Sequence, residues 1–160
     1  MFVYYFTLPG SQFLVGALPL PDGAYQPNGG HGRIRYKLPA DFDRSQVLYN
    51  LDYARQEFTA KPLVIVEWFF DAIQLRQNNY HHAIALMGRT MSMAQEQLLC
   101  NHISISSRIL IMLNENKQSS AAKEAICRRL SRFFYTKVCT FPPPKTRVGE
   151  LTPEDIKNMS

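Results

Sequence analysis

The sequence predicts an α/β protein in which helices flank a parallel β-sheet. The main observation is residues 61–75, KPLVIVEWFFDAIQL, where a short β-branched and aliphatic run is followed by an acid and an apolar helical pattern. Strand and helix patterns then alternate twice more, over residues 82–102 and 107–135. This alternation is typical of a parallel sheet with crossover helices.

The beginning of the chain predicts a β-hairpin. Residues 2–7 and 12–17 are aromatic and β-branched runs, and Pro9-Gly10 between them favours a tight turn. Residues 18–32 are rich in proline and glycine, so we expect a long surface loop. Residues 33–37 alternate basic and apolar side chains, which in an extended chain puts the cations on one face. That face is either a solvated edge or a contact with phosphates.

Further elements follow from local patterns. Apolar residues at helical spacing after Asp43 predict a helix over 47–54, and Ser92 is a plausible cap for a helix over 93–102. Thr152 with Pro153 and two acids has the pattern of another helix start. The other predicted elements are strands at 84–87, 109–113 and 138–141 and a long helix at 121–135.

Composition limits the possible classes of protein. At 160 residues and 46% hydrophobic, the chain can bury one core and fits one compact unit with a small appendage. No apolar run approaches the ~20 residues that span a membrane, and the start lacks a signal-peptide pattern, so we expect a cytoplasmic protein with no membrane partner. Three scattered cysteines predict neither a disulfide framework nor a zinc site. The net charge of +5 favours polyanionic partners without identifying one.

Polar residues gather where the predicted strands end. Glu67 closes the first strand, and Asp71 lies one helical turn later on the same side. Open α/β sheets bind ligands beyond the carboxyl ends of their strands, so both acids are expected in one crevice. The alternative for Glu67 is a capping role at the start of the helix. Asn114 and Asn116 follow the third strand.

These motifs resemble the toprim domain of bacterial primases, topoisomerases and small nucleases. The first toprim strand ends in a Glu, matched by Glu67, and the next helix carries an Asp, matched by Asp71. The second strand ends in a Gly and a polar loop, matched by 88–92. The third strand of the family ends in Asp-x-Asp, and the matching positions here are Asn114 and Asn116.

The rest of the chain resembles the catalytic core of bacterial primases. Arg35-Tyr36 is similar to a Lys-Tyr motif of that core, residues 42–44 to its Phe-x-Lys motif, and residues 48–51 to its Leu-Tyr-x-Leu helix. The resemblance implies a primase-like N-terminal segment at 1–56, a toprim (Rossmann-like) domain at 57–142, and a C-terminal tail with a short helix at 143–160.

The resemblance also implies roles for particular residues. Glu67 and Asp71 take the catalytic positions, and Glu67 with Asn114 and Asn116 takes the place of the Mg²⁺ ligands. Two carboxylates are missing from that set, so we expect Mg²⁺ to bind weakly if at all. The expected nucleic-acid contacts are Arg33, Arg35, Lys37 and Arg44.

Three functions agree with this pattern. The first is a primase-like toprim protein that binds single-stranded DNA or nucleotides in DNA replication, with metal-dependent catalysis weakened. The second is an active magnesium-dependent primase, nucleotidyltransferase or nuclease. The third is a structural module that docks on a replication partner such as a helicase or a separate zinc-finger-bearing region.

The sequence also predicts the response of the crevice to mutation. Asp at positions 114 and 116 is expected to raise Mg²⁺ affinity by orders of magnitude. Glu67→Gln is expected to stabilise the fold by relieving repulsion with Asp71. Glu67→Gln is expected to destabilise the fold instead if Lys117 or Arg89 is a counter-ion of Glu67.

Overall fold

A computed structural model describes residues 4–8, 11–15, 42–56, 61–116 and 119–159. The chain forms two units, residues 1–42 and 43–160. In the first, β1 (Tyr4–Leu8) and β2 (Ser11–Val15) pair antiparallel with Leu8 opposite Ser11. The predicted hairpin is therefore confirmed. The predicted loop and the basic extended segment at 33–37 lie outside the described residues.

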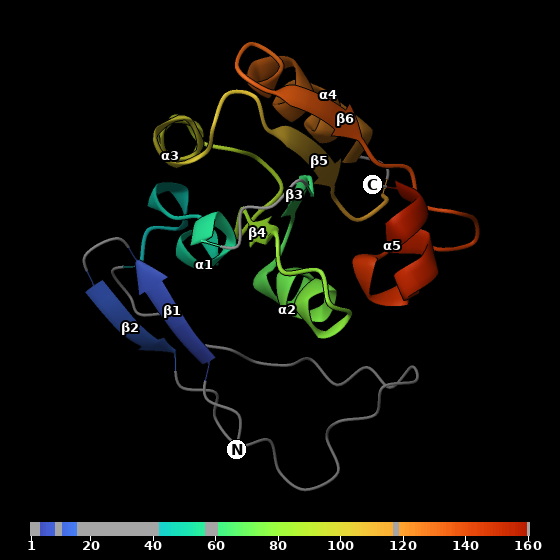
Figure 1. The fold of residues 1–160 in the computed structure, drawn as a ribbon, viewed down its shortest axis with the longest axis horizontal. Coiled ribbons are helices and arrows are strands. Elements are labelled where there is room, and N and C mark those ends of the chain that lie inside the picture. Colours follow the sequence, from blue (N-terminus) through green and yellow to red (C-terminus); the bar gives the residue numbers. More distant parts are fainter. Residues whose placement is uncertain (1–3, 9–10, 16–41, 57–60, 117–118, 160) are drawn as a thin grey trace, which may run out of the picture. The chain divides into compact units, whose positions relative to one another are not determined.

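The second unit is built on a four-stranded parallel sheet, which confirms the predicted fold class (Figure 1). The strand order is β4-β3-β5-β6, so β3 and β5 are central. All four residues of β3 are buried, as expected for a strand covered on both faces. The strands are β3 (Leu63–Val66), β4 (Ala83–Ala85), β5 (Arg108–Met112) and β6 (Tyr135–Val138).

Helices cover both faces of this sheet. Leu63 and Ile65 point into one apolar layer, whereas Val64 and Val66 point into the other, as the two-residue period of a strand requires. The first layer is completed by α1 (Leu51–Gln56), α3 (Met93–His102) and α4 (Ser119–Leu130). The second contains α2 (Phe69–Gln77), the 3₁₀ turn η2 (Val148–Glu150) and α5 (Pro153–Met159), and Figure 1 shows α2 and α5 on the side opposite α3 and α4.

Two predicted boundaries are wrong. Helix α4 ends at Leu130 instead of 135, and β6 occupies 135–138 instead of 138–141. The strand pairs with β5 in a register that places Arg108 opposite Tyr135. Its alternately exposed and half-buried residues mark an edge strand, while Phe134 completes the core from the turn that precedes it. Phe133 and Phe134 therefore extend the helical apolar spacing beyond the helix itself.

The helix predicted over 47–54 also begins later than expected. Tyr49 forms an antiparallel bridge with Ala85, and Asn50 has a φ of 67° and donates from Nδ2 to the Ala83 carbonyl at 2.8 Å. The chain therefore covers the outer edge of β4 before α1 starts. Helix α1 lies in the unit that contains the sheet.

The end of the chain packs on the same unit. The cap predicted at Thr152 is present: its Oγ1 accepts from the Asp155 N–H at 3.2 Å, and its own N–H donates to Asp155 Oδ2 at 2.7 Å. Val148, Leu151 and Ile156 are buried in the layer that contains α2. Among the residues described, no helix has the length and apolar character needed to cross a membrane.

Candidate functional site

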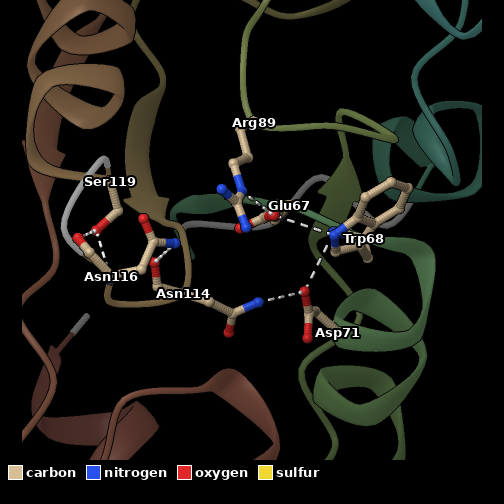
Figure 2. Close-up of polar contacts among 7 residues, drawn as sticks. All are labelled: Glu67, Trp68, Asp71, Arg89, Asn114, Asn116 and Ser119. Atoms are coloured by element: carbon tan, nitrogen blue, oxygen red, sulfur yellow. Dashed lines mark hydrogen bonds and ion pairs between the residues drawn. The ribbon is translucent and has the colours of Figure 1, made fainter. Parts of the chain in front are cut away.

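Glu67 lies directly after β3, and its carboxylate is held by a cation of the protein (Figure 2). Its side chain is only 4% exposed, and Oε1 accepts from Arg89 Nε at 3.0 Å and from Trp68 Nε1 at 3.0 Å. Arg89 comes from the loop after β4, which meets the end of β3 because the two strands are neighbours. The Gly88 N–H donates to the Glu67 carbonyl at 3.1 Å, and this bond holds the loop after β4 close to the end of β3. Glu67 is therefore a compensated buried charge.

Asp71 lies in the first turn of α2 and faces the same crevice. Its Oδ2 accepts from the Trp68 N–H at 3.1 Å and from Asn114 Nδ2 at 3.2 Å. Burial raises the pKa of the Asp71 carboxyl from 3.8 to about 6, and the negative charge of Glu67 adds to that increase. The two hydrogen bonds and the positive charge of Arg147 act in the opposite direction.

Asn114 joins Asp71 to the C-terminal segment. It lies two residues after the end of β5. Its Oδ1 accepts from the Val148 N–H at 2.9 Å, while its Nδ2 donates to Asp71. A backbone N–H can only donate, so the amide atom facing Val148 must be the oxygen. The side of Asn114 that faces the acid is consequently a donor rather than a metal ligand.

Asn116 belongs to a different local structure. Its N–H donates to Ser119 Oγ at 2.9 Å, and that hydroxyl donates back to the Asn116 carbonyl at 2.8 Å, at the start of α4. Its Nδ2 donates to the Asn114 carbonyl at 3.5 Å (Figure 2). The described hydrogen bonds thus join Asn114 to Asp71, and they join Asn116 to Asn114 and Ser119.

Of the predicted nucleic-acid contacts, Arg44 lies in the described part of the chain. It starts the 3₁₀ turn η1 (Arg44–Gln46), is exposed, and holds its guanidinium 5.7 Å from the centre of the Trp68 ring. Arg44 is therefore next to the Glu67 crevice, a position that its distance in sequence does not reveal. Arg33, Arg35 and Lys37 lie outside the described residues.

The residues present do not fit a magnesium ion. One oxygen of Glu67 is engaged by a guanidinium, and Asn114 turns its nitrogen toward Asp71. Within the described ranges, no cluster of three or more His, Cys, Asp or Glu side chains could hold a metal. Magnesium requires converging oxygen ligands, and this crevice presents donors and a fixed cation instead.

From the sequence, Arg89 was expected as a possible counter-ion of Glu67 or as part of a loop at 88–90 that faces a phosphate, and Trp68 had no expected site role. The available signal for Arg89 was its position after Gly88, at the end of the neighbouring strand. Trp68 stands where the toprim pattern has a small residue, and its indole N–H now donates to the Glu67 carboxylate. The link from Asn114 to Val148 had no sequence signal.

Glu67→Gln is expected to destabilise the protein by about 1–2 kcal/mol in metal-free buffer at neutral pH. The Gln oxygen can still accept from Trp68, but the charge that faces Arg89 is lost. Chemical denaturation in EDTA measures the change, with Glu124→Gln on the exposed surface of α4 as a charge-matched control. Stabilisation by Glu67→Gln would show that repulsion from Asp71 outweighs the attraction to Arg89.

Comparisons with known proteins identify the fold. No family model matches the chain, and no curated protein matches it significantly in sequence. Among solved structures, the Aquifex aeolicus primase with its zinc-binding and RNA polymerase domains aligns with a TM-score of 0.60 and 16% identity, over 78% of this chain and 31% of that one. The RNA polymerase domain of Mycobacterium tuberculosis primase aligns with a TM-score of 0.61 and 13% identity, over 82% and 47%. The chain has the fold of a bacterial primase catalytic core.

A third structure with this primase fold contains nucleic acid. The DnaG primase catalytic domain bound to single-stranded DNA aligns with a TM-score of 0.54 and 19% identity, over 69% of this chain and 36% of that one. The present chain therefore spans about a third to a half of the length of the primase structures it matches. Its likeness to them is one of fold, with the toprim-like sheet at the centre.

Proposed function

We propose that this protein is a primase-like binder of single-stranded nucleic acid or nucleotides in DNA replication, in which metal-dependent catalysis is weakened or lost. The primase fold supports the general function. The main observation in favour of weakened catalysis is the contact between Arg89 Nε and Glu67 Oε1, at 3.0 Å. A guanidinium engages the carboxylate that would serve as a metal ligand in a metal-dependent enzyme of this fold.

The energetic argument against a catalytic ion is one of charge. At an effective dielectric of about 20, each carboxylate lost from about 4 Å of a dication removes several kcal/mol of attraction. Positions 114 and 116 have lost two such charges, and Arg89 adds a repulsive one. Phosphoryl transfer depends on a metal that neutralises charge on the leaving oxygen, so the expected rate without it is low.

Nucleic-acid binding is supported by the basic character of the chain and by Arg44. The net charge is +5, and Arg44 is exposed beside the aromatic ring of Trp68. An arginine next to an indole can bind a phosphate while the ring offers a surface on which a base stacks. Arg33, Arg35 and Lys37 are further candidate phosphate contacts in this proposal, on the basis of the sequence alone.

The salt dependence of DNA binding tests the proposal. A labelled oligodeoxythymidylate is expected to bind with an affinity that falls steeply as salt rises, and Arg35→Ala with Arg44→Ala is expected to reduce the slope by about one unit per lost phosphate contact. Arg128→Ala, on the exposed surface at the end of α4, is the charge-matched control.

Each outcome of this titration separates two hypotheses. A slope reduced by Arg128→Ala but unchanged by Arg44→Ala would place the DNA on α4. Absence of binding at low salt would reject the nucleic-acid function and favour a structural module that docks on a partner such as a helicase or a zinc-finger-bearing region.

A further inference from the structure

The two edges of the parallel sheet differ in how they are covered. At the β4 edge, Tyr49 and Ala85 exchange backbone hydrogen bonds of 3.0 and 3.1 Å, and Asn50 donates to the Ala83 carbonyl. The segment before α1 therefore covers that edge. At the other edge, β6 has β5 as its only strand neighbour within the described residues (Figure 1). The β6 edge is consequently the place where a further strand can pair with the sheet.

The backbone of β6 points alternate polar groups away from β5. The Tyr135 N–H donates to the Ser107 carbonyl at 3.2 Å, and the same kind of bond to the β5 side recurs at Cys139 at 2.9 Å. In a parallel pair, every second residue of one strand bonds to its neighbour. The N–H and C=O groups of Thr136 and Val138 therefore point outward, toward the edge.

The side chains of β6 give the two faces of this edge different chemistry. Thr136 and Val138 are half-buried on the α4 side: Thr136 Oγ1 lies 3.3 Å from Cys127 Sγ, and Val138 packs on the apolar layer that contains α4. Tyr135 and Lys137 belong to the opposite face and are exposed, Tyr135 by 72%. A strand added at this edge would meet apolar neighbours on one face and a lysine on the other.

The β6 edge is also basic. Residues 125–138 contain three arginines, one lysine and no Asp or Glu. Within the described part of the chain, exposed Arg132 and Lys137 form no ion pair with a carboxylate. Arg132 lies 5.2 Å from the centre of the Phe133 ring, and Lys137 Nζ donates to the Met159 carbonyl at 3.3 Å.

The acids of the second half of the chain do not offset these two charges. Residues 91–160 contain six acids: Glu96, Glu115, Glu124, Glu150, Glu154 and Asp155. Four of them contact other groups: Glu96 contacts Arg129, Glu115 contacts Lys123, Glu150 contacts Thr146, and Asp155 contacts Lys145. Exposed Glu124 has Arg128 within about one turn of α4. Exposed Glu154 likewise has Lys157 within about one turn of α5.

This charge selects the kind of strand that fits. A second copy of the chain is a poor occupant, because pairing two β6 strands brings like charges together, whereas an acidic strand meets attraction. We propose that the β6 edge binds an extended segment of a partner protein in which acidic and apolar side chains alternate. The segment pairs with Thr136 and Val138 as a fifth strand, with its apolar side chains toward α4 and its acids beside Lys137. Arg132 lies at the amino end of the same edge. This inference does not depend on the nucleic-acid function.

The test measures binding of a labelled eight-residue peptide, in which Glu alternates with Val, to the full chain by fluorescence anisotropy. We expect saturable binding that weakens as salt rises, and no binding of a peptide with Lys in place of Glu. Thr136→Pro removes one outward N–H without removing a bond to β5, and is expected to weaken binding at least ~10-fold. Thr136→Val is the matched control, because it loses the same hydroxyl but keeps the N–H, and it is expected to bind as the unmodified chain does.

Two further measurements separate the charge from the backbone pairing. Arg132→Gln with Lys137→Gln is expected to lower the affinity at least ~10-fold at low salt and to flatten the salt dependence. Arg76→Gln, exposed at the end of α2, is the charge control and is expected to leave the affinity unchanged. Methylation of alternate peptide nitrogens tests the pairing without altering the protein: one alternate set is expected to abolish binding and the other to leave it intact.

The outcomes that overturn the proposal are distinct. They are equal binding of the Glu and Lys peptides, equal affinity in Thr136→Pro and Thr136→Val, and tolerance of both methylated peptides. A concentration-dependent dimer that Thr136→Pro dissociates would assign the edge to a second copy of the chain instead. An oligodeoxythymidylate that displaces the peptide and binds more weakly to Arg132→Gln/Lys137→Gln would assign it to nucleic acid.

Discussion

Asn114→Asp is expected to lower the free energy of unfolding by roughly 2–4 kcal/mol in metal-free buffer at neutral pH. The native amide donates to Asp71 at 3.2 Å and accepts from the Val148 N–H at 2.9 Å. An Asp can keep the bond to Val148, but it replaces the donor that faces Asp71 with a second carboxylate oxygen. Two acids at this distance in a partly buried crevice repel each other. Urea denaturation in EDTA measures the loss.

Magnesium is expected to offset this loss. Asp71 and an Asp at position 114 are a pair of hard oxygen ligands, and an ion that binds only the folded state stabilises it. Calorimetry on Asn114→Asp/Asn116→Asp is expected to give a Mg²⁺ affinity higher by orders of magnitude than that of the unmodified chain. We expect this gain to come from position 114, because the Asn114 side chain contacts Asp71.

Asn116→Asp is the matched control, since it adds the same charge two residues away. It is expected to leave Mg²⁺ affinity close to that of the unmodified chain. A gain in affinity from Asn116→Asp alone would mean that position 116, rather than position 114, supplies the metal ligand.

Elements with strong local signals were predicted correctly from the sequence. The run at 63–66 is apolar because β3 is covered on both faces, and the caps at Ser92 and Thr152 place a side-chain oxygen where free helix N–H groups need one. The fold class follows from the order of these elements along the chain. Each of these signals lies within a few residues of the element that it predicts.

The predicted ends of helices and strands were wrong where tertiary contacts override the local sequence pattern. Tyr135–Val138 is a polar edge strand whose pairing to β5 is invisible in its own residues, while the apolar spacing of Phe133 and Phe134 favours a longer helix. At the other end, Asn50 takes a positive φ so that the preceding residue can bridge to β4. Neither feature has a local sequence signature.

The location of the candidate site was predictable, but its partners were not. Parallel strands bring their carboxyl ends together, so Glu67, Asp71, Asn114 and Asn116 were expected to meet. A described hydrogen bond joins Asn114 to Asp71. The distance between Arg89 and Glu67 depends on how the loop after β4 folds. The bond from Val148 to Asn114 joins residues 34 positions apart and depends on how the C-terminal segment returns to the sheet. These two contacts decide whether the crevice fits a metal.

Asp71→Asn is expected to stabilise the protein at neutral pH by on the order of 2–3 kcal/mol, after allowance for partial exposure of this side chain. Both described hydrogen bonds of the carboxylate go to Oδ2, so an amide oxygen in that position can keep both. The substitution removes the charge that burial and Glu67 disfavour. The positive charge that lowers the pKa of Asp71 belongs to Arg147, which is exposed and can be solvated.

The pH dependence of the unfolding free energy tests whether the charge of Asp71 causes the expected difference in stability. The pKa of Asp71 is raised from 3.8 to about 6 by folding, so its ionisation costs stability fully above about pH 6. That cost declines as the pH falls from 6 toward 4, and it disappears below the pKa of 3.8 that the carboxyl has in the unfolded chain. Asp43, Glu150 and Asp155 have lowered carboxyl pKa values, so their contributions to stability are lost in acid. Because all three are present in both proteins, these losses cancel in the comparison. The difference in unfolding free energy between Asp71→Asn and the unmodified chain is therefore expected to be largest above pH 7 and to vanish near pH 4. A difference that stays constant over this range would mean that Asp71 keeps an ordinary pKa and that Arg147 and the two donors compensate its charge completely.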